Sequence, residues 1–239
     1  MRLAKLSRSE HADLRIRPDL VEASASDQHL VPVVVSEFRK AATQYPLVFA
    51  KHADTGRFNP YVLNGLGLNE NLFWTGTELD VTYVPLNVRR QPFFVGADNA
   101  LCIDLDNPCL NASGTKAIVN SDGSDSAYLK EMLSILGELI AGQEATGQLI
   151  ASLLSLDLLT PILLDIALED GTPLRLEGLY GIDEDRLRRL EERDFAQLRK
   201  TGQLDLIYAV LMASGQIFRL IRLKNQRIAS RRAWQTHES

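Results

Sequence analysis

Short apolar segments separated by turn residues fill the first half of the chain. β-branched and aromatic residues favour a pleated sheet, and a proline near the start of a segment is compatible with a strand. A short helix is expected over 37–43, with Ser36 as its N-cap. Strands are predicted over 31–35, 45–50, 59–66, 72–75, 80–85, 93–95 and 101–105. This succession of short strands indicates a largely antiparallel sheet.

The second half changes to a helical period. Apolar residues three and four positions apart predict a long helix over 128–156, relaxed or interrupted near Gly142 and Gly147. Asp170-Gly171 lies between two apolar runs, which is a strong hairpin signal. The expected elements are a hairpin built from 158–168 and 173–180, a helix over 184–195 capped by Asp183, and a helix over 203–227.

These elements predict an α+β fold, with a mainly antiparallel sheet in the first half and with helices and a β-hairpin in the second. Neither a long linker nor an internal repeat separates the halves, so they are expected to pack as one unit. The predicted organisation is an N-terminal arm over 1–28, a single domain over 29–228 and a basic flexible tail over 229–239.

Composition and charge limit the classes of function. With 45% hydrophobic and 24% charged residues, the 239-residue chain has the composition of a globular protein. A net charge of −5 argues against a general nucleic-acid coat, which needs a broad cationic surface. The N-terminal segment is too charged for a secretory signal, and the longest apolar stretches, 150–164 and 204–221, contain polar and charged residues. We therefore expect a cytoplasmic protein without a transmembrane span and without nucleic acid as a partner.

The sequence contains no motif for a metal, a cofactor or a nucleophile. Cys102 and Cys109 lack the further ligands of a zinc site and are expected to be reduced, packed thiols, with a disulfide or redox role as the alternative. Asp104 and Asp106 alternate on a predicted strand, but neither they nor segment 120–125 precede the glutamate that completes an EF-hand loop. The histidines are scattered, and no Gly-x-Ser-x-Gly elbow occurs. We therefore expect no catalytic residues, no metal and no cofactor.

Arg89 and Arg90 are the principal candidates for ligand binding. Pro92 stiffens the segment that carries them. A guanidinium offers a planar fork of donors that matches a carboxylate, a phosphate or a peptide C-terminus. The structural alternative is that one arginine pairs with an internal aspartate, such as Asp80 or Asp104, while the other is solvated. The candidate ligand-binding residues are Arg89, Arg90, Tyr83, Trp74 and Asp104.

The C-terminal segment is basic. Arginine and lysine occur at positions 219, 222, 224, 227, 231 and 232, after the last acidic residue of the predicted helix, Asp205. A basic amphipathic helix suits an anionic membrane surface, an acidic partner or RNA. The alternative is that the positive charge complements the helix macrodipole and that the tail is solvated.

A set of short motifs is distributed along nearly the whole chain. In the first half they are Pro32, Glu37-Phe38, Ala41-Ala42, Tyr45-Pro46-Leu47-Val48-Phe49, Asn71-Leu72-Phe73, Tyr83-Val84-Pro85, Arg89-Arg90, Pro92-Phe93 and Cys102-Ile103-Asp104. In the second half they are Tyr128-Leu129, Leu158-Leu159-Thr160-Pro161, Gly178-Leu179, Asp183, Leu187 and Gly202-Gln203-Leu204-Asp205-Leu206-Ile207-Tyr208. Together these motifs resemble the bacterial SapC family. Asn87 and Gln91 stand where the resemblance leads us to expect aromatic residues.

The resemblance implies little mechanism. The family is associated with a surface-layer role, and the names of some members refer to peptide transport. The cytoplasmic location expected above does not fit a secreted lattice protein or a permease. Similar proteins accompany flavin-dependent halogenase and outer-membrane receptor genes, which implies a cytosolic helper in the uptake or metabolism of peptide-like or halogenated compounds. We predict a non-catalytic accessory or binding protein with a small-molecule, peptide or protein partner. The alternative is an enzyme of unfamiliar type that acts on a carboxylated small molecule through an Arg/Tyr/Asp pocket.

Overall fold

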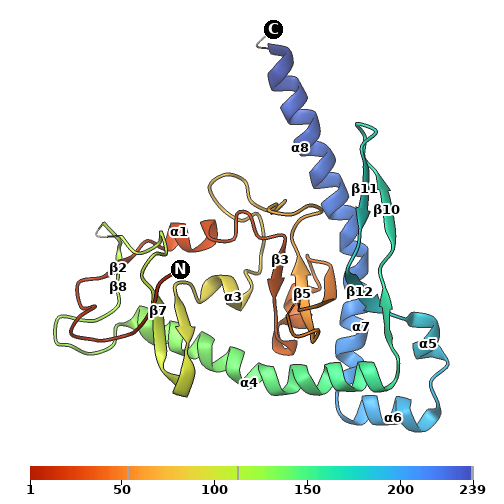
Figure 1. Cartoon of the computed structure of the whole chain (residues 1–239), viewed down its shortest axis with the longest axis horizontal. Coiled ribbons are helices and arrows are strands. Elements are labelled where there is room, and N and C mark those ends of the chain that lie inside the picture. Colours follow the sequence, from red (N-terminus) through yellow and green to blue (C-terminus); the bar gives the residue numbers. More distant parts are fainter. Residues whose placement is uncertain (53, 112, 238–239) are drawn as a thin grey trace. The chain divides into compact units, whose positions relative to one another are not determined.

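The computed structural model describes residues 1–52, 54–111 and 113–237 and shows an α+β protein of helices and antiparallel sheets (Figure 1), which confirms the predicted fold class. The chain forms two compact units, and each unit combines two separate segments. Unit 1 consists of Met1–Asp27 and Trp74–Gly142, and unit 2 consists of Gln28–Phe73 and the chain from Gln143 onward. The segment predicted as an N-terminal arm is thus part of unit 1.

Unit 1 contains a three-stranded antiparallel sheet in the order β1-β7-β6. Its strands are β1 (Leu3–Lys5), β7 (Leu101–Asp104) and β6 (Phe93–Val95). The register places Leu3 opposite Asp104 on one side of β7 and Phe94 opposite Cys102 on the other side. The sequence predicts β6 and β7 but not β1, because the exposed ends of β1 give it no clear apolar alternation.

The remaining elements of unit 1 are short, except for one helix. They are the paired strands β2 (Arg15–Ile16) and β8 (Lys116–Ala117), α1 (Pro18–Ala23), α3 (Leu86–Arg89), the 3-10 helix η2 (Ala97–Asn99) and the first part of α4 (Ala127–Ser155). Phe93 on β6 is fully buried, and its ring centroid lies 6.3 Å from that of Tyr128 on α4. Helix α4 therefore covers the face of the sheet that carries Phe93.

Unit 2 contains a five-stranded antiparallel sheet in the order β3-β5-β4-β12-β9. Its strands are β3 (Leu30–Pro32), β5 (Phe58–Leu63), β4 (Leu47–Lys51), β12 (Leu179–Ile182) and β9 (Leu159–Pro161). Each edge strand carries a proline, which limits its pairing with further strands. The strands predicted over 31–105 do not form one sheet, because β6 and β7 belong to unit 1, while β12 and β9 join unit 2 from the second half of the chain.

The predicted hairpin around Asp170-Gly171 is confirmed in unit 2. Strand β10 (Leu164–Ala167) pairs with β11 (Pro173–Leu176). Gly171 in the turn has a φ of 82°, a left-handed conformation that glycine adopts without strain. The hairpin lies beside the C-terminal helix α8 (Ile217–His237), where Asn225 Oδ1 accepts a hydrogen bond from the Glu169 backbone N–H at 3.1 Å (Figure 1).

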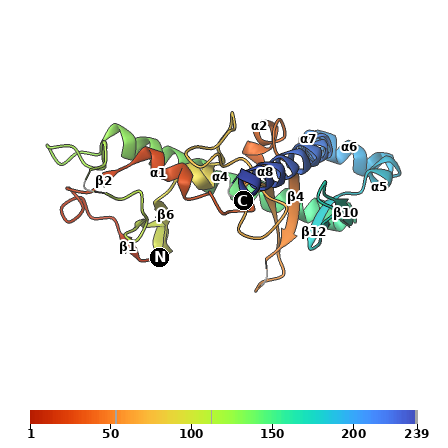
Figure 2. The same ribbon diagram turned by 90° about the horizontal axis from the view of Figure 1, so that it is seen from above.

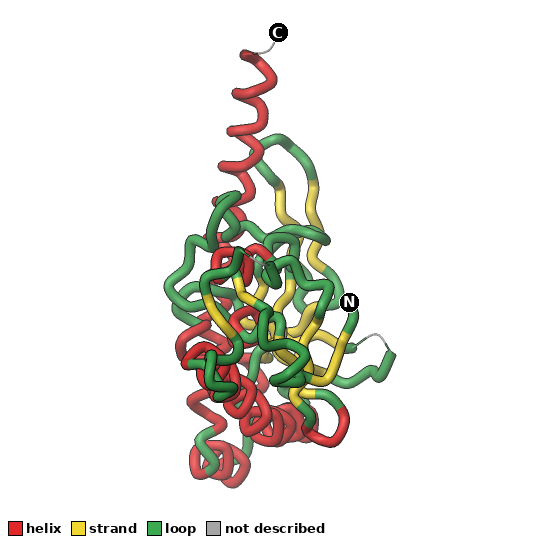
Figure 3. The backbone as a smooth tube through the Cα atoms, turned by 90° about the vertical axis from the view of Figure 1, so that its left-hand side faces the viewer, coloured by secondary structure: helices red, strands yellow, loops and turns green. Residues whose placement is uncertain are grey.

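The helices of unit 2 come mainly from the second half of the chain. They are η1 (Val35–Glu37), α2 (Phe38–Ala41), the last part of α4, α5 (Glu184–Arg188), α6 (Glu192–Lys200), α7 (Gln203–Ala213), η3 (Ser214–Gln216) and α8. Helices α2 and α6 pack against α7 (Figure 2). Helix α8 leads to the C-terminal end of the described chain (Figure 3). The predicted flexible tail is therefore helical through His237, and Glu238 and Ser239 lie outside the described residues.

Several predicted helix boundaries differ from the observed ones. Ser36 lies inside η1 and is not an N-cap, because the Glu37 side chain accepts the Val34 backbone N–H at 2.9 Å and fixes the turn. Asp183 is confirmed as a cap, since its Oδ1 accepts the Arg186 backbone N–H at 2.8 Å. The predicted helix over 184–195 divides into α5 and α6. Helix α4 continues through Gly142 and Gly147 without interruption.

Two predicted strands, over 72–75 and 80–85, are not formed. The backbone there is satisfied locally, as in the 2.9 Å hydrogen bond from Thr75 N–H to the Glu78 carbonyl, and only an isolated bridge joins Trp74 to Leu79. Segment 86–92, for which the sequence predicts no helix or strand, contains α3.

One helical stretch among the described residues, Gln203–Ala233, is long and apolar enough to cross a membrane by length and composition alone. It joins α7, η3 and α8, and its most apolar window has a mean hydropathy of 1.5. Core helices of soluble proteins also satisfy these criteria. The expected absence of a transmembrane span therefore stays a prediction.

Candidate functional site

The five predicted ligand-binding residues all lie in unit 1. Arg89 is the last residue of α3, Arg90 follows as its C-cap, and Asp104 ends β7. Trp74 takes part in the isolated bridge to Leu79, and Tyr83 lies in the irregular segment before α3. The structure therefore concentrates Arg89, Arg90 and Asp104 around the corner between α3 and the three-stranded sheet.

The Arg90 side chain is held against this corner by three contacts. Its Nε donates to Asn87 Oδ1 at 2.8 Å, and its Nη1 donates to the Phe93 carbonyl at 2.9 Å. The guanidinium carbon lies 4.1 Å from the centroid of the Phe94 ring, which is cation–π geometry. A rigid backbone corner and an aromatic ring thus fix the plane of the guanidinium.

The Arg90 guanidinium has no carboxylate partner among the described residues. Its contacts use two of the five N–H donors of an arginine, which leaves both N–H groups of Nη2 and one of Nη1. Burial lowers the pKa of Arg90 to about 10, since desolvation disfavours the charged form. The group still carries a positive charge at neutral pH.

Asp104, Cys102 and Phe94 share one face of the three-stranded sheet. Residues directly opposite in neighbouring strands lie on the same face, as do alternate residues along one strand. Phe94 is opposite Cys102, and Asp104 is two residues further along β7. Because the guanidinium of Arg90 stacks on Phe94, it lies over this face. The opposite face, which carries Phe93, is the one covered by α4.

The Asp104 carboxylate accepts hydrogen bonds from backbone N–H groups. Its Oδ1 accepts the Arg2 backbone N–H at 2.8 Å and the Asp106 backbone N–H at 3.2 Å, and the side chain is buried. These contacts hold β1 in place beside β7. The structural alternative for the arginines, an internal aspartate as partner of Arg90, is therefore not realised at Asp104.

Arg89 has a different environment from Arg90. Its Nη2 lies 3.2 Å from Glu131 Oε1 on α4, and both side chains are exposed, at 40% and 56%. Exposed ion pairs of this kind contribute little to stability, because water and salt screen them. The two consecutive arginines therefore differ: Arg89 is exposed and paired, whereas Arg90 is desolvated and has no carboxylate partner in the described part of the chain.

The residues that define the Arg90 site were only partly recognised from the sequence. Phe94 is the aromatic residue in direct contact with Arg90, whereas a contribution of Trp74 and Tyr83 to ligand binding stays a prediction. Asn87 and Gln91 depart from the expected family pattern, and both accept hydrogen bonds: Asn87 from Arg90, and Gln91 Oε1 from Asn107 Nδ2 at 3.2 Å. The sequence signal that could have identified Asn87 is its position three residues before Arg90, because side chains at this spacing meet on a helix.

The cysteines of unit 1 are free thiols, as expected for reduced, packed residues. Cys109 is fully buried, and burial raises the pKa of its thiol to about 12. Its backbone N–H donates to Asn107 Oδ1 at 3.0 Å. Burial also raises the pKa of the nearby Tyr128 hydroxyl. Both groups are therefore protonated at neutral pH and provide no nucleophile next to the Arg90 site.

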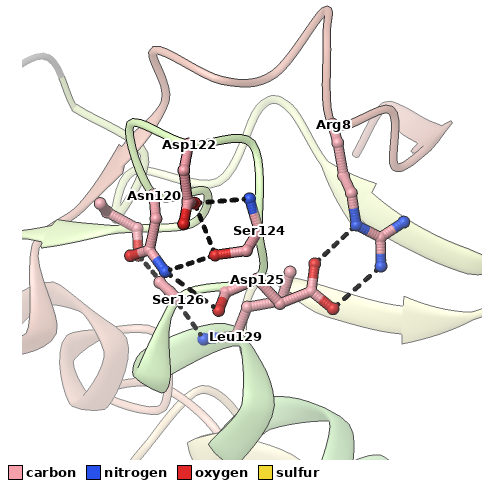
Figure 4. Close-up of polar contacts among 8 residues, drawn as sticks. Arg8, Asn120, Asp122, Ser124, Asp125, Ser126 and Leu129 are labelled. Atoms are coloured by element: carbon pink, nitrogen blue, oxygen red, sulfur yellow. Dashed lines mark hydrogen bonds and ion pairs between the residues drawn. The ribbon is translucent and has the colours of Figure 1, made fainter.

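Segment 120–125, considered above for cation binding, forms a capped turn before α4 (Figure 4). Asp122 Oδ1 accepts the Ser124 backbone N–H at 2.9 Å, and Arg8 donates to both oxygens of Asp125 at 2.6 and 2.9 Å. The hydrogen bonds from Arg8 hold the pKa of Asp125 below its usual value. Within the described ranges, no group of three or more His, Cys, Asp or Glu side chains has the arrangement of a metal site.

Replacing Ser126 with alanine should remove the N-cap of α4 and destabilise the protein by about 1 kcal/mol. Ser126 Oγ accepts the Leu129 backbone N–H at 3.1 Å and donates to the Ala117 carbonyl at 2.7 Å. Urea denaturation measures the loss. Ser124→Ala is the matched control in the same turn, because Ser124 is exposed and is not bonded to a helical N–H. Equal losses for both variants would contradict the capping role of Ser126.

Comparison with known proteins assigns the family. The family model described as SapC matches residues 6–220, a range that contains the Arg90 corner, most of the segment predicted as an arm, and nearly all of the helices and strands of both units. Comparison with curated proteins and comparison with solved structures each gave no match. The motifs that suggest SapC in the sequence all fall inside the matched range, and the chain belongs to the SapC family.

Proposed function

We propose that this SapC-family protein is a non-catalytic accessory protein that binds an anionic small molecule or peptide through Arg90. The observation that carries the proposal is the Arg90 guanidinium, fixed on Phe94 and by Asn87, with three unused N–H donors and no carboxylate partner among the described residues. Buried or half-buried cations are ordinarily paired with an anion, and here a ligand carboxylate or phosphate supplies it.

The electrostatic surroundings support a ligand of this class. Desolvation, which lowers the pKa of Arg90, also weakens the screening of its charge, so that a bound anion gains more Coulomb energy than at a solvated arginine. A planar guanidinium with unused N–H donors on both Nη1 and Nη2 offers one donor to each oxygen of a carboxylate. The peptide C-terminus and the carboxylated small molecule are the two ligand forms that combine this group with an apolar body for contact with Phe94.

The cellular role follows from the family resemblance alone. A cytoplasmic helper in the uptake or metabolism of peptide-like compounds, or of halogenated compounds that carry a carboxylate, recognises that group. Mass spectrometry of the protein purified from its native host under non-denaturing conditions identifies the ligand that remains bound. A co-purifying carboxylate or phosphate compound supports the proposal.

The enzyme alternative has less support from the site. It requires Asp104 as a proton-transfer group, whereas this carboxylate accepts two backbone N–H groups in a buried position. The thiol of Cys109 and the hydroxyl of Tyr128 have raised pKa values and are not activated. A turnover assay with the identified ligand tests this alternative directly, and unchanged ligand after prolonged incubation supports a binding protein.

Replacing Arg90 with lysine should weaken binding of the identified ligand by about tenfold or more, because the charge remains but the planar fork is lost. Isothermal titration calorimetry well below the melting temperature measures the change. Arg89→Lys is the matched control, one residue earlier and already paired with Glu131, and should change the affinity by less than about twofold. Equal affinity in wild type and Arg90→Lys, with the melting temperature lowered in the variant, would show that Arg90 has only a structural role.

A further inference from the structure

Large apolar side chains are exposed along the joined helices α7 and α8 of unit 2. Tyr208, Met212 and Phe218 are 46%, 79% and 73% exposed. The opposite side of the same helices is buried through Ile207, Val210 and other residues of the core. Single exposed apolar residues are common on protein surfaces, but a row on one element marks a contact with a partner or a lipid phase.

The three residues lie on one side of the helical stretch. Tyr208 and Met212 are four positions apart, which places them one above the other on an α-helix. The intervening 3-10 helix η3 has only about three residues per turn and rotates Phe218 toward that side. Arg222 is exposed and four positions after Phe218, so it continues the same row. The row therefore runs from apolar residues on α7 to a basic residue on α8.

Basic residues dominate the chain beyond this apolar row. Between Asp205 and Glu238 the sequence contains no acidic residue, although the whole chain has a net charge of −5. Arg222 and Arg231 are exposed. A concentration of positive charge next to exposed apolar side chains complements a surface that is both anionic and apolar beneath its charged layer.

The inner side of α8 is tied to unit 2 by three other basic residues. Lys224 Nζ lies 2.7 Å from Glu70 Oε1, in a largely buried ion pair. Arg227 Nη2 donates to the Asn71 carbonyl at 2.8 Å, and the guanidinium of Arg219 lies 5.0 Å from the centroid of the Phe73 ring. Insertion of this stretch across a bilayer would break these contacts and place charges in hydrocarbon. The stretch therefore suits a position on a membrane and not a path through it.

We propose that α7 and α8 form a docking surface for the anionic lipid headgroups of a membrane. Tyr208, Met212 and Phe218 enter the boundary between headgroups and acyl chains, while Arg222 binds a lipid phosphate. Arg231 lies about half a turn around α8 from Arg222 and adds to the positive charge of the helix that attracts an anionic surface. This surface lies on unit 2 and is independent of the anion site at Arg90 in unit 1.

A lipid surface fits these residues better than the other occupants. A symmetric dimer that brought the two α8 helices together would be opposed by charge repulsion, because α8 carries several basic residues and no acidic one. An RNA backbone would satisfy the arginines but would leave Met212 and Phe218 exposed to water. An anionic membrane satisfies both the apolar row and the basic residues beside it.

Flotation of the full chain with vesicles tests the proposal. The protein should float with vesicles of phosphatidylcholine containing about one third phosphatidylglycerol and should stay in solution with phosphatidylcholine alone. Concentrated salt should release it, since the arginine contacts are screened. The double variant Met212→Gln, Phe218→Gln should bind the anionic vesicles at least about tenfold more weakly. The double variant Arg222→Ala, Arg231→Ala should show a loss of about tenfold.

Matched controls distinguish binding through this surface from nonspecific binding to vesicles. Leu68→Gln with Leu163→Gln changes two equally exposed apolar residues of unit 2, and Lys116→Ala with Lys130→Ala removes two exposed charges of unit 1. Both control variants should bind the anionic vesicles like the wild type. The proposal is overturned if the wild type does not float with anionic vesicles, or if the test variants float unchanged. It is also overturned if sedimentation velocity shows a dimer, or a gel-shift assay shows an RNA complex, that these substitutions abolish while vesicle binding persists.

Discussion

Replacing Gly65 with alanine should lower the melting temperature by about 5 to 10 °C, the result of a loss of about 2 to 3 kcal/mol. A Cβ atom at this position would lie 2.1 Å from the Glu70 carbonyl oxygen, and that oxygen belongs to the backbone and has little freedom to move. The loop is closed by a hydrogen bond from Leu72 N–H to the Asn64 carbonyl at 2.8 Å. Its displacement should also weaken the ion pair between Glu70 and Lys224 that attaches α8 to unit 2.

Gly67→Ala is the control in the same loop. A Cβ atom there meets only Glu70 Oε2, at 3.9 Å, which is an ordinary contact with a side chain. Circular dichroism melting curves of the two variants should therefore differ, with Gly67→Ala within about 0.5 kcal/mol of the wild type. Similar destabilisation in both variants would mean that the close approach of Gly65 to Glu70 is not what limits substitution.

Replacing Asp104 with alanine should destabilise the protein by about 2 kcal/mol, because the backbone N–H groups of Arg2 and Asp106 then lose their acceptor. Asp104→Asn keeps an oxygen acceptor in the same place and should recover most of the loss. Urea unfolding curves measure both effects. Strand β1 should be the first element to lose protection in hydrogen exchange, since Asp104 fastens the start of the chain to β7.

Asp106→Ala serves as the matched control two residues away. Asp106 is 52% exposed and lies 3.4 Å from the N-terminal amino group and 3.5 Å from Arg2 Nε. Exposed pairs of this length contribute little, so the control should change stability by less than about 0.5 kcal/mol. If Asp104→Ala kept full stability but lost the ligand of the Arg90 site, Asp104 would be a ligand-binding residue and its structural role would be refuted.

The sequence predicted much of the candidate site but could not assign its partners. It identified Arg90 from its position before Pro92, and it treated Arg89 as equivalent. The two arginines differ only because Glu131 on α4 comes within reach of Arg89, while Phe94 and the Phe93 carbonyl surround Arg90. These neighbours are brought together by the turn between α3 and β6 and by the packing of α4, neither of which a local pattern records.

The elements that the sequence determined by itself are those whose signals are local. The helical period of α4, the Asp170-Gly171 turn and the Asp183 cap each depend on residues within a few positions of one another. Such signals act through backbone conformation and adjacent hydrogen bonds, and they persist in any tertiary arrangement. The neighbouring strands β4 and β5 follow the same rule, because a short turn joins them.

Only the tertiary structure decided which strands share a sheet and which charges remain unpaired. β12 pairs with β4 although about 130 residues separate them in the chain, and β1 pairs with β7 across about 100 residues. Pairing over such distances depends on the loop-closure entropy and on the packing of all intervening elements. Tertiary packing also holds Lys224 and Arg227 inward, leaves Arg222 exposed, and desolvates Arg90, which has no carboxylate partner among the residues that the structure describes. The sequence determines the residue types, but the environment of each residue forms only when distant segments pack together.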